Sequence, residues 1–155
     1  MCIKSGVKKF IYSSTAAVYG NKTKKASEYD SLKPMSPYPR SKLKLEKYLE
    51  KNQKKISCII LRYFNVAGAD KNLRCGFNIK KGYNLILNLC RAAVKNEKLR
   101  INGDNYKTKD GTTIRDFIHV SDLAEIHYKV SKVINNKKIF FILNCGYGFG
   151  FSVLE

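Results

Sequence analysis

A tyrosine and a lysine four residues apart, Tyr38 and Lys42, form the pair in this sequence best suited to proton transfer. They open an amphipathic run that reads as a helix, and side chains at i and i+4 stand one above the other on a helix. A free tyrosine, with a pKa of about 10, is a poor base at neutral pH. An ammonium about 4 Å away favours a phenolate by up to about 4 kcal/mol at an effective dielectric constant near 20. The same spacing also fits a solvated helix face, so the pair alone does not establish a site.

A threonine that follows a short apolar strand is the second candidate. The strand begins at Phe10 and runs through F-I-Y-S-S into T-A-A-V-Y-G, residues 15–20. In an open α/β sheet, ligands bind beyond the carboxyl ends of the strands. Thr15 is therefore placed to hydrogen-bond a sugar hydroxyl or carbonyl, while a serine-rich turn explains the same residues without a ligand.

Strands and helices alternate around these residues. The strand at Phe10 precedes a helix that opens at Pro37 and ends near Asn52, and residues 56–65 then form a nearly continuous apolar strand. Such a run is typical of a strand buried on both faces in a parallel sheet. Strand, helix and strand make a βαβ unit with a right-handed crossover. The pattern predicts an α/β fold, a partial Rossmann-like, doubly wound parallel sheet.

The rest of the chain predicts further elements of both kinds. A turn covers residues 66–70, a basic irregular stretch covers 70–82, and an amphipathic helix covers 84–95. Strands are expected at 98–102, 113–120 and 140–144. Ser121 or Asp122 would cap a helix through Ile134.

The two ends of the chain resemble interrupted helices. Residues 3–9 look like a last helical turn with Gly6 as a left-handed cap. Ser152 and Glu155 have the spacing of a capping box, which announces a helix. We therefore expect the sequence to be an internal piece of a longer protein.

Composition indicates one ordinary domain of 155 residues with a real core, since 44% of the residues are hydrophobic. The sequence shows no membrane-length apolar run and no signal-peptide pattern. Five scattered cysteines and two isolated histidines form no zinc spacing, so no metal site is expected. A reduced, cytoplasmic protein is the simplest interpretation.

The formal net charge of +18 first suggests a nucleic-acid partner. Three features argue against it: the excess is mostly lysine, it is spread along the chain, and asparagine and isoleucine are frequent, as an A-rich codon bias would produce. A basic protein also suits an anionic ligand such as a nucleotide diphosphate. We expect neither a nucleic-acid nor a membrane partner.

Five segments occur in the order found in a known family. They are F-I-Y-S-S-T-A-A-V-Y-G, S-P-Y-P-R-S-K, L-R-Y-F-N-V-A-G-A, D-G-T-T-I-R-D-F-I-H-V-S-D-L-A and G-F-S-V-L-E. Together they resemble the extended short-chain dehydrogenase/reductases, the NAD-dependent epimerase/dehydratase family, and within it the galactose-epimerase branch. The resemblance covers most of the chain.

The resemblance implies NAD-dependent epimerisation at C4 of a UDP-hexose, interconverting UDP-glucose and UDP-galactose in galactose metabolism. Tyr38 would take the proton of the sugar 4-hydroxyl while hydride passes to NAD, and hydride would return to the other face of the 4-keto sugar. Lys42 would bond the nicotinamide ribose and favour the ionised tyrosine, and Thr15 would bond the same sugar oxygen.

Further binding roles follow from the same resemblance. Phe64 matches a cofactor contact, and Thr15, Tyr38 and Lys42 also touch the cofactor. The substrate-binding positions implied beyond Thr15 and Tyr38 are Asn65, Asn84, Leu85, Arg100, Asn102 and Arg115. Asn65 and Arg115 would hold the diphosphate, a role that the guanidinium fork suits, while Arg100 and Asn102 would lie on a strand lining the uridine.

This sequence also departs from the family pattern. The glycine-rich G-x-x-G-x-x-G that seats the cofactor pyrophosphate is absent. Residues 1–66 would be the C-terminal half of the NAD-binding domain, and residues 67–155 the sheet return and part of a substrate-binding region. A homodimer is the implied state of the full-length parent.

Three alternatives to this function stay open. A catalytically inactive remnant, or a part that needs a separate N-terminal half, would explain the missing motif. An epimerase acting on another UDP-sugar would share the motifs. Dehydration is disfavoured, because the dehydratases carry an Asp-Glu pair where this chain has Ala16 and Ala17.

Overall fold

Three parallel strands form the main sheet of the computed structural model, which describes residues 2–22, 25–76, 84–136 and 138–155. The strand order is β1–β2–β5, with bounds Lys9–Thr15, Ser57–Tyr63 and Phe140–Cys145. The central strand β2 is buried along nearly its whole length. The predicted parallel sheet and its βαβ unit are confirmed.

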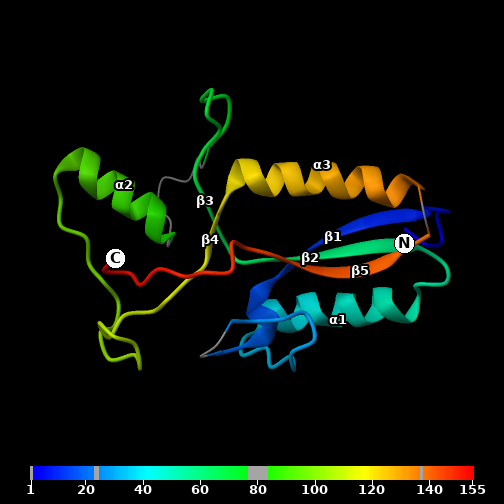
Figure 1. Cartoon of the computed structure of the whole chain (residues 1–155), viewed down its shortest axis with the longest axis horizontal. Helices are drawn as coiled ribbons and strands as arrows, with labels where there is room; N and C mark the ends of the chain where they lie inside the picture. Colours follow the sequence, from blue (N-terminus) through cyan, green and yellow to red (C-terminus); the bar gives the residue numbers. More distant parts are fainter. Residues whose placement is uncertain (1, 23–24, 77–83, 137) are drawn as a thin grey trace.

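Two helices cover the faces of this sheet (Figure 1). Helix α1, Pro37–Lys51, lies on one face and helix α3, Val120–Asn136, on the other. Side chains alternate between the faces along β2, so Ile59 and Leu61 pack with α3 while Cys58 and Ile60 pack on the α1 side. The continuous apolar run in the sequence reflects this double burial.

A second, two-stranded parallel sheet extends from the first. It pairs β3, Asn65–Ala67, with β4, Phe117–His119. The predicted turn at 66–70 is therefore wrong at its start, since Val66 and Ala67 continue into a strand. The predicted strand over 113–120 narrows to β4 and an isolated bridge between Arg115 and Phe151.

Helix α2, Leu85–Lys95, lies to one side of the main sheet (Figure 1). Its predicted span is confirmed, and Asn84 caps it by accepting a 3.1 Å hydrogen bond from the Leu87 amide. The strand predicted at 98–102 is wrong. These residues, apart from Leu99, are exposed and pair with no strand in the described part of the chain. The alternation of polar and apolar residues is therefore not enough, because a strand also requires a neighbouring strand.

Helix α3 begins at Val120, two residues before the start that a Ser121 cap would give, and it ends at Asn136 rather than at Ile134. Ser121 and Asp122 lie inside its first turn, so neither is its cap. The preceding residue, His119, takes that role, because its Nδ1 accepts a 3.2 Å hydrogen bond from the Ser121 amide. Imidazole is not among the usual capping side chains, which is why the sequence misplaced the cap.

Both predicted end motifs are present. Gly6 has a φ of +77°, the left-handed geometry expected of a cap. Ser152 and Glu155 form the capping box: the Glu155 carboxylate accepts from the Ser152 amide at 2.8 Å, and Ser152 Oγ accepts from the Glu155 amide at 3.2 Å. The irregular stretch predicted over 70–82 lies outside the described residues from 77 onward.

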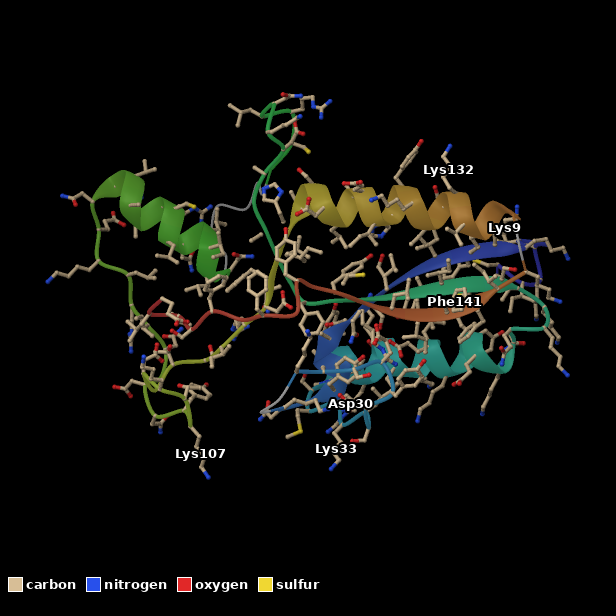
Figure 2. The ribbon with its side chains drawn as sticks, viewed as in Figure 1. Lys9, Asp30, Lys33, Lys107, Lys132 and Phe141 are labelled. Carbon is tan, nitrogen blue, oxygen red and sulfur yellow. The ribbon has the colours of Figure 1, made fainter. Side chains whose placement is uncertain are left out.

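The positive charge is dispersed over the molecule (Figure 2). Labelled lysines lie on β1 (Lys9), on the loop after it (Lys33), on the loop before β4 (Lys107) and on α3 (Lys132). Among the described residues, no helix is both long and apolar enough to cross a lipid bilayer.

Candidate active site

The carboxyl ends of the three parallel strands meet at one edge of the sheet. Thr15, Tyr63 and Cys145 are neighbours in register across β1, β2 and β5. All three strands run in the same direction, so the loops that leave them gather beyond this edge.

Thr15 ends β1 with its side chain at the start of a short 3₁₀ helix, Ala16–Tyr19. Its Oγ1 accepts a 3.2 Å hydrogen bond from the Ala17 amide. The amide occupies an acceptor site of the hydroxyl, so the hydroxyl proton is left to donate outward. The turn predicted here thus holds the group that the ligand hypothesis needs.

Tyr38 and Lys42 lie together on the first two turns of α1. The Lys42 ammonium lies 5.7 Å from the centroid of the Tyr38 ring and donates a 2.8 Å hydrogen bond to the carbonyl of Ser13. This bond brings the helix pair to the end of β1, two residues from Thr15. The Tyr38 side chain is 58% exposed, so it is accessible to a ligand.

Two prolines begin α1 without disrupting it. Pro37 and Pro39 occupy the first turn, where a missing N–H breaks no intrahelical bond. Ser36 before them is extended, as a residue before proline should be. Tyr38 is helical although Pro39 follows it, so the predicted pairing with Lys42 survives.

Phe64, Asn65 and Arg115 gather where β2 passes into β3. The Phe64 amide donates to the Cys145 carbonyl at 3.1 Å, and a Cβ on Gly146 would lie 2.8 Å from the Phe64 ring. Arg115 Nη1 donates to Asn65 Oδ1 at 3.3 Å, and the Asn65 amide nitrogen Nδ2 donates to the Asp116 carbonyl at 3.1 Å. The structure thus joins Asn65 and Arg115, fifty residues apart, into one polar group.

Four other predicted residues lie around α2. Asn84 and Leu85 are half-buried at its start, with Asn84 committed to capping. Arg100 and Asn102 are exposed on the segment that follows the helix, not on a strand. Figure 1 shows α2 and this segment beside the carboxyl end of the sheet, apart from the helices that cover it.

A hydrogen-bonded chain at the same edge was not predicted. The Tyr63 hydroxyl lies 2.6 Å from Ser13 Oγ and 2.7 Å from His127 Nε2, and His127 Nδ1 lies 2.8 Å from the Leu123 carbonyl. A carbonyl can only accept, so His127 Nδ1 donates to the Leu123 carbonyl, while the Tyr63 hydroxyl donates its proton to Ser13 Oγ. Burial raises the pKa of Tyr63, against the opposing effect of the Ser13 hydrogen bond.

A buried ion pair below Tyr38 and Lys42 was also missed. Arg62 on β2 and Glu46 on α1 are 1% and 3% exposed, and their charged atoms approach to 2.6 Å. One signal was available, since an arginine in an otherwise apolar buried strand requires a carboxylate partner.

Tyr12 lies beside Lys42, and burial together with a nearby carboxylate keeps its phenol neutral. Burial raises the pKa of Tyr12 to about 12, with the Glu46 carboxylate adding to the effect. Lys42 Nζ lies 5.3 Å from the centroid of the Tyr12 ring. Tyr12 therefore supports the lysine as an aromatic surface rather than as a second base.

The polar groups at this edge suit an organic ligand. Over the described residues, no three His, Cys, Asp or Glu side chains gather in a way that could hold a metal ion. Hydroxyl, phenol and ammonium groups at one end of the edge, and the Asn65 and Arg115 group at the other, suit a sugar joined to an anion.

Comparison with known proteins gives consistent matches. Residues 1–146 match the model of the NAD dependent epimerase/dehydratase family. The UDP-glucose 4-epimerases of Azospirillum brasilense and Bacillus subtilis (strain 168) are 41% identical over 158 residues and 42% identical over 159 residues, covering 99% and 98% of this chain. The UDP-glucose 4-epimerase of Bifidobacterium longum, solved in complex with NAD+ and UDP, superposes with a TM-score of 0.89 at 38% identity over 99% of this chain.

These relatives are longer than the chain that matches them. It covers 45% of the Azospirillum protein, 47% of the Bacillus protein and 48% of the Bifidobacterium structure, so it spans about half of their length. The family model nevertheless covers almost all of the 155 residues. The chain therefore belongs to the NAD dependent epimerase/dehydratase family.

Proposed function

We propose that this chain carries the catalytic centre of an NAD-dependent epimerase acting at C4 of a UDP-hexose, of the UDP-glucose/UDP-galactose type. The observation that carries the proposal is the Lys42 ammonium, which lies against the Tyr38 ring and is hydrogen-bonded to Ser13, two residues from Thr15. The relatives of this chain support a UDP-hexose as the substrate, since they are UDP-glucose 4-epimerases.

Tyr38 acts as the base on the sugar 4-hydroxyl and returns the proton when the configuration has changed. Thr15 donates its free proton to the same oxygen and holds the sugar in place. Such positioned proton transfer contributes about 10²–10⁴-fold to a rate.

The residues at this edge fit a nicotinamide cofactor on their own chemistry. Lys42 presents an ammonium for ribose hydroxyls, Tyr38 is exposed beside it, and Phe64 supplies an apolar ring at the end of β2. NAD, when bound, supplies the hydride acceptor and donor of the reaction. Thr15, Tyr38, Lys42 and Phe64 would hold it.

Asn65 and Arg115 would bind the diphosphate of the sugar nucleotide. The Arg115 guanidinium presents a fork of donors that matches phosphate oxygens. Asn65 Oδ1 accepts a hydrogen bond from one of these donors and so fixes the direction of the guanidinium. Asn84, Leu85, Arg100 and Asn102 would contact the nucleoside. Their grouping around α2, with the Arg100 and Asn102 side chains exposed, supports this assignment.

A chimera tests this function. The chain would replace the stretch that it matches in the Bacillus subtilis UDP-glucose 4-epimerase, and conversion of UDP-galactose to UDP-glucose would be measured with NAD. We expect turnover in the chimera. A folded chimera that binds UDP yet converts no UDP-sugar would contradict the proposal.

A second possibility is that the 155 residues alone are not an enzyme. The observations that favour it are the coverage of about half of each relative and the lack of a G-x-x-G-x-x-G motif in the sequence. In that case the chain would be an inactive remnant or would act together with a separate polypeptide.

Other properties of the whole protein are proposals of the same kind. An epimerase for another UDP-sugar would use the same residues and would differ in turnover when UDP-N-acetylglucosamine replaces UDP-glucose. We also propose a cytoplasmic location, consistent with five free thiols. We further propose that the whole protein is a homodimer, which sedimentation would test.

A further inference from the structure

Three polar side chains form a column along α1. Tyr38, Lys42 and Glu46 follow one another at four-residue intervals, so all three share the helix stripe that faces the carboxyl half of the sheet. The first is exposed, whereas Glu46 is 3% exposed. The column therefore runs from the accessible site to the interior.

The buried end of the column is held by two strands. Arg62 on β2 donates to Glu46 Oε2 from Nη2 at 2.6 Å and to Oε1 from Nε at 3.2 Å. Ser14 on β1 donates its hydroxyl to the same carboxylate. Burial opposes the charge of Arg62, but its hydrogen bonds to Glu46 and Tyr19 raise its pKa overall.

The same network reaches the loop after β1 and the third strand. Arg62 Nη1 donates to the Tyr19 hydroxyl at 2.9 Å, and Tyr19 in turn donates to Asn144 Oδ1 on β5 at 2.7 Å. Within the described residues, every buried side-chain nitrogen and oxygen has a hydrogen-bond partner. A fully bonded network of this kind allows one arrangement of its elements.

We propose that Glu46 and Arg62 are positioning residues, which fix the rotation and height of α1 against β1 and so hold Tyr38 and Lys42 beside Thr15. This inference rests on the proposed function of Tyr38, Lys42 and Thr15. Ser14 precedes Thr15 directly, so the Glu46 carboxylate ties the helix to the strand one residue from the catalytic hydroxyl. A helix turns by about 100° per residue, so a slip of one residue would carry Tyr38 out of the site.

Stability alone is a weak explanation for this pair. Desolvation of two charges offsets most of their attraction, and apolar residues of similar volume often replace a buried pair without loss of stability. Apolar contacts already hold α1, since Leu49 packs on β1 and β2 and Leu43 packs on Val18 and Tyr19 of the 3₁₀ helix. The ion pair adds hydrogen bonds of defined direction, which apolar contacts do not provide.

The test compares two double variants of the 155-residue chain by NMR. In Glu46→Leu/Arg62→Met the buried pair becomes apolar at similar volume. The matched control is Glu125→Leu/Lys129→Met, which replaces an exposed 2.8 Å ion pair on α3 with the same two apolar residues. The readouts are the ring resonances of Tyr38, eight residues from Glu46, and the ammonium resonance of Lys42, with urea unfolding recorded for both variants.

We expect the buried variant to keep its urea midpoint within the range of the control while the Tyr38 and Lys42 side-chain resonances move several-fold further than in the control. Unchanged Tyr38 and Lys42 resonances in a folded variant would overturn the proposal. If the double variant does not fold, Glu46→Gln, which keeps the shape and removes the charge, is read in the same way.

A second measurement separates this proposal from the function on which it rests. In the Bacillus chimera, displacement of Tyr38 should lower kcat by about 10²-fold with little change in KM, because misplacement by about 1 Å has that cost. The NMR result uses no substrate, so an inactive chimera would count against the function and leave the positioning result standing.

Discussion

The thiol of Cys58 lies in the buried strand β2 between two covered faces. Burial raises its pKa from an ordinary value near 9 to about 12. Between these values the unfolded chain loses the thiol proton while the folded chain retains it. The contribution of this thiol to the free energy of unfolding is therefore fully present below about pH 9, and it is lost as the pH rises toward 12.

We predict that Cys58→Ala flattens the loss of stability between pH 9 and pH 11. Urea unfolding at a series of pH values measures the slope. Cys2→Ala, which removes an exposed thiol, should leave the slope as in the wild type. An equal slope in wild type and Cys58→Ala would contradict the assigned burial effect.

At the scale of residues, spacing predicted what lies close in sequence. Tyr38 and Lys42 are four residues apart on a helix, and the structure brings them together as expected. The contact of Tyr63 with His127 spans 64 positions, and neither residue's neighbours in sequence reveal it. The resemblance assigned Asn65 and Arg115 to the same diphosphate, but their direct contact was not predicted.

At the scale of elements, helix α2 shows how much an N-cap contributes to the stability of a helix. Helix α2 contains no fully buried residue, so tertiary packing holds it weakly. Asn84→Ala removes the side-chain bond to the Leu87 amide and should cost about 1 kcal/mol. Amide exchange in the first turn of α2 should accelerate, while Asn88→Ala within the helix should leave it unchanged.

The loop after β5 depends on a glycine for its close packing. A Cβ on Gly146 would lie 2.6 Å from the Asp116 carboxylate and 2.8 Å from the Phe64 ring. Asp116 accepts hydrogen bonds from the amides of Tyr147 and Gly148, so it cannot move freely.

We therefore predict that Gly146→Ala destabilises the protein by about 1–3 kcal/mol and displaces Phe64. Chemical unfolding measures the first effect and the Phe64 ring resonances the second. Gly76→Ala is the control, since a Cβ there would meet Ala69 at an ordinary 3.5 Å. Equal stability of the two variants would show that the loop relaxes.

Helices and strands were predicted correctly where the periodic pattern was long. They were predicted wrongly where a strand depends on pairing with a neighbouring strand. Helix α1 was predicted to within about a residue at each end, and strand β2 to within one residue at its start and two at its end. The segment 98–102 has the alternation of a strand but no neighbouring strand in the described part of the chain. The part of β3 after Asn65 was predicted as a turn because its partner β4 lies 52 residues further along, with Asn65 paired to Phe117.

At the scale of the whole molecule, the sequence pattern predicted the fold. The parallel sheet with helices on both faces follows from the buried strand and the crossover helix (Figure 1). The chain spans about half of its relatives and has no glycine-rich pyrophosphate motif.

We predict that the 155-residue chain alone binds NAD more weakly than micromolar. Lys42 and Phe64 would contact the nicotinamide end, whereas the pyrophosphate end would lack the helix N-terminus that such motifs provide. Isothermal titration with NAD measures this affinity. Micromolar binding would show that the chain is sufficient for the cofactor.

The central claim is that the Tyr38 phenol carries the proton in UDP-sugar epimerisation. The most direct measurement is the rate of UDP-galactose conversion by the Bacillus chimera with Tyr38→Phe, beside Tyr48→Phe at an exposed position of the same helix. We expect Tyr38→Phe to lose about 10²–10⁴-fold in kcat with UDP binding retained, and Tyr48→Phe to match the parent chimera. A Tyr38→Phe chimera that keeps the parent rate would contradict the account.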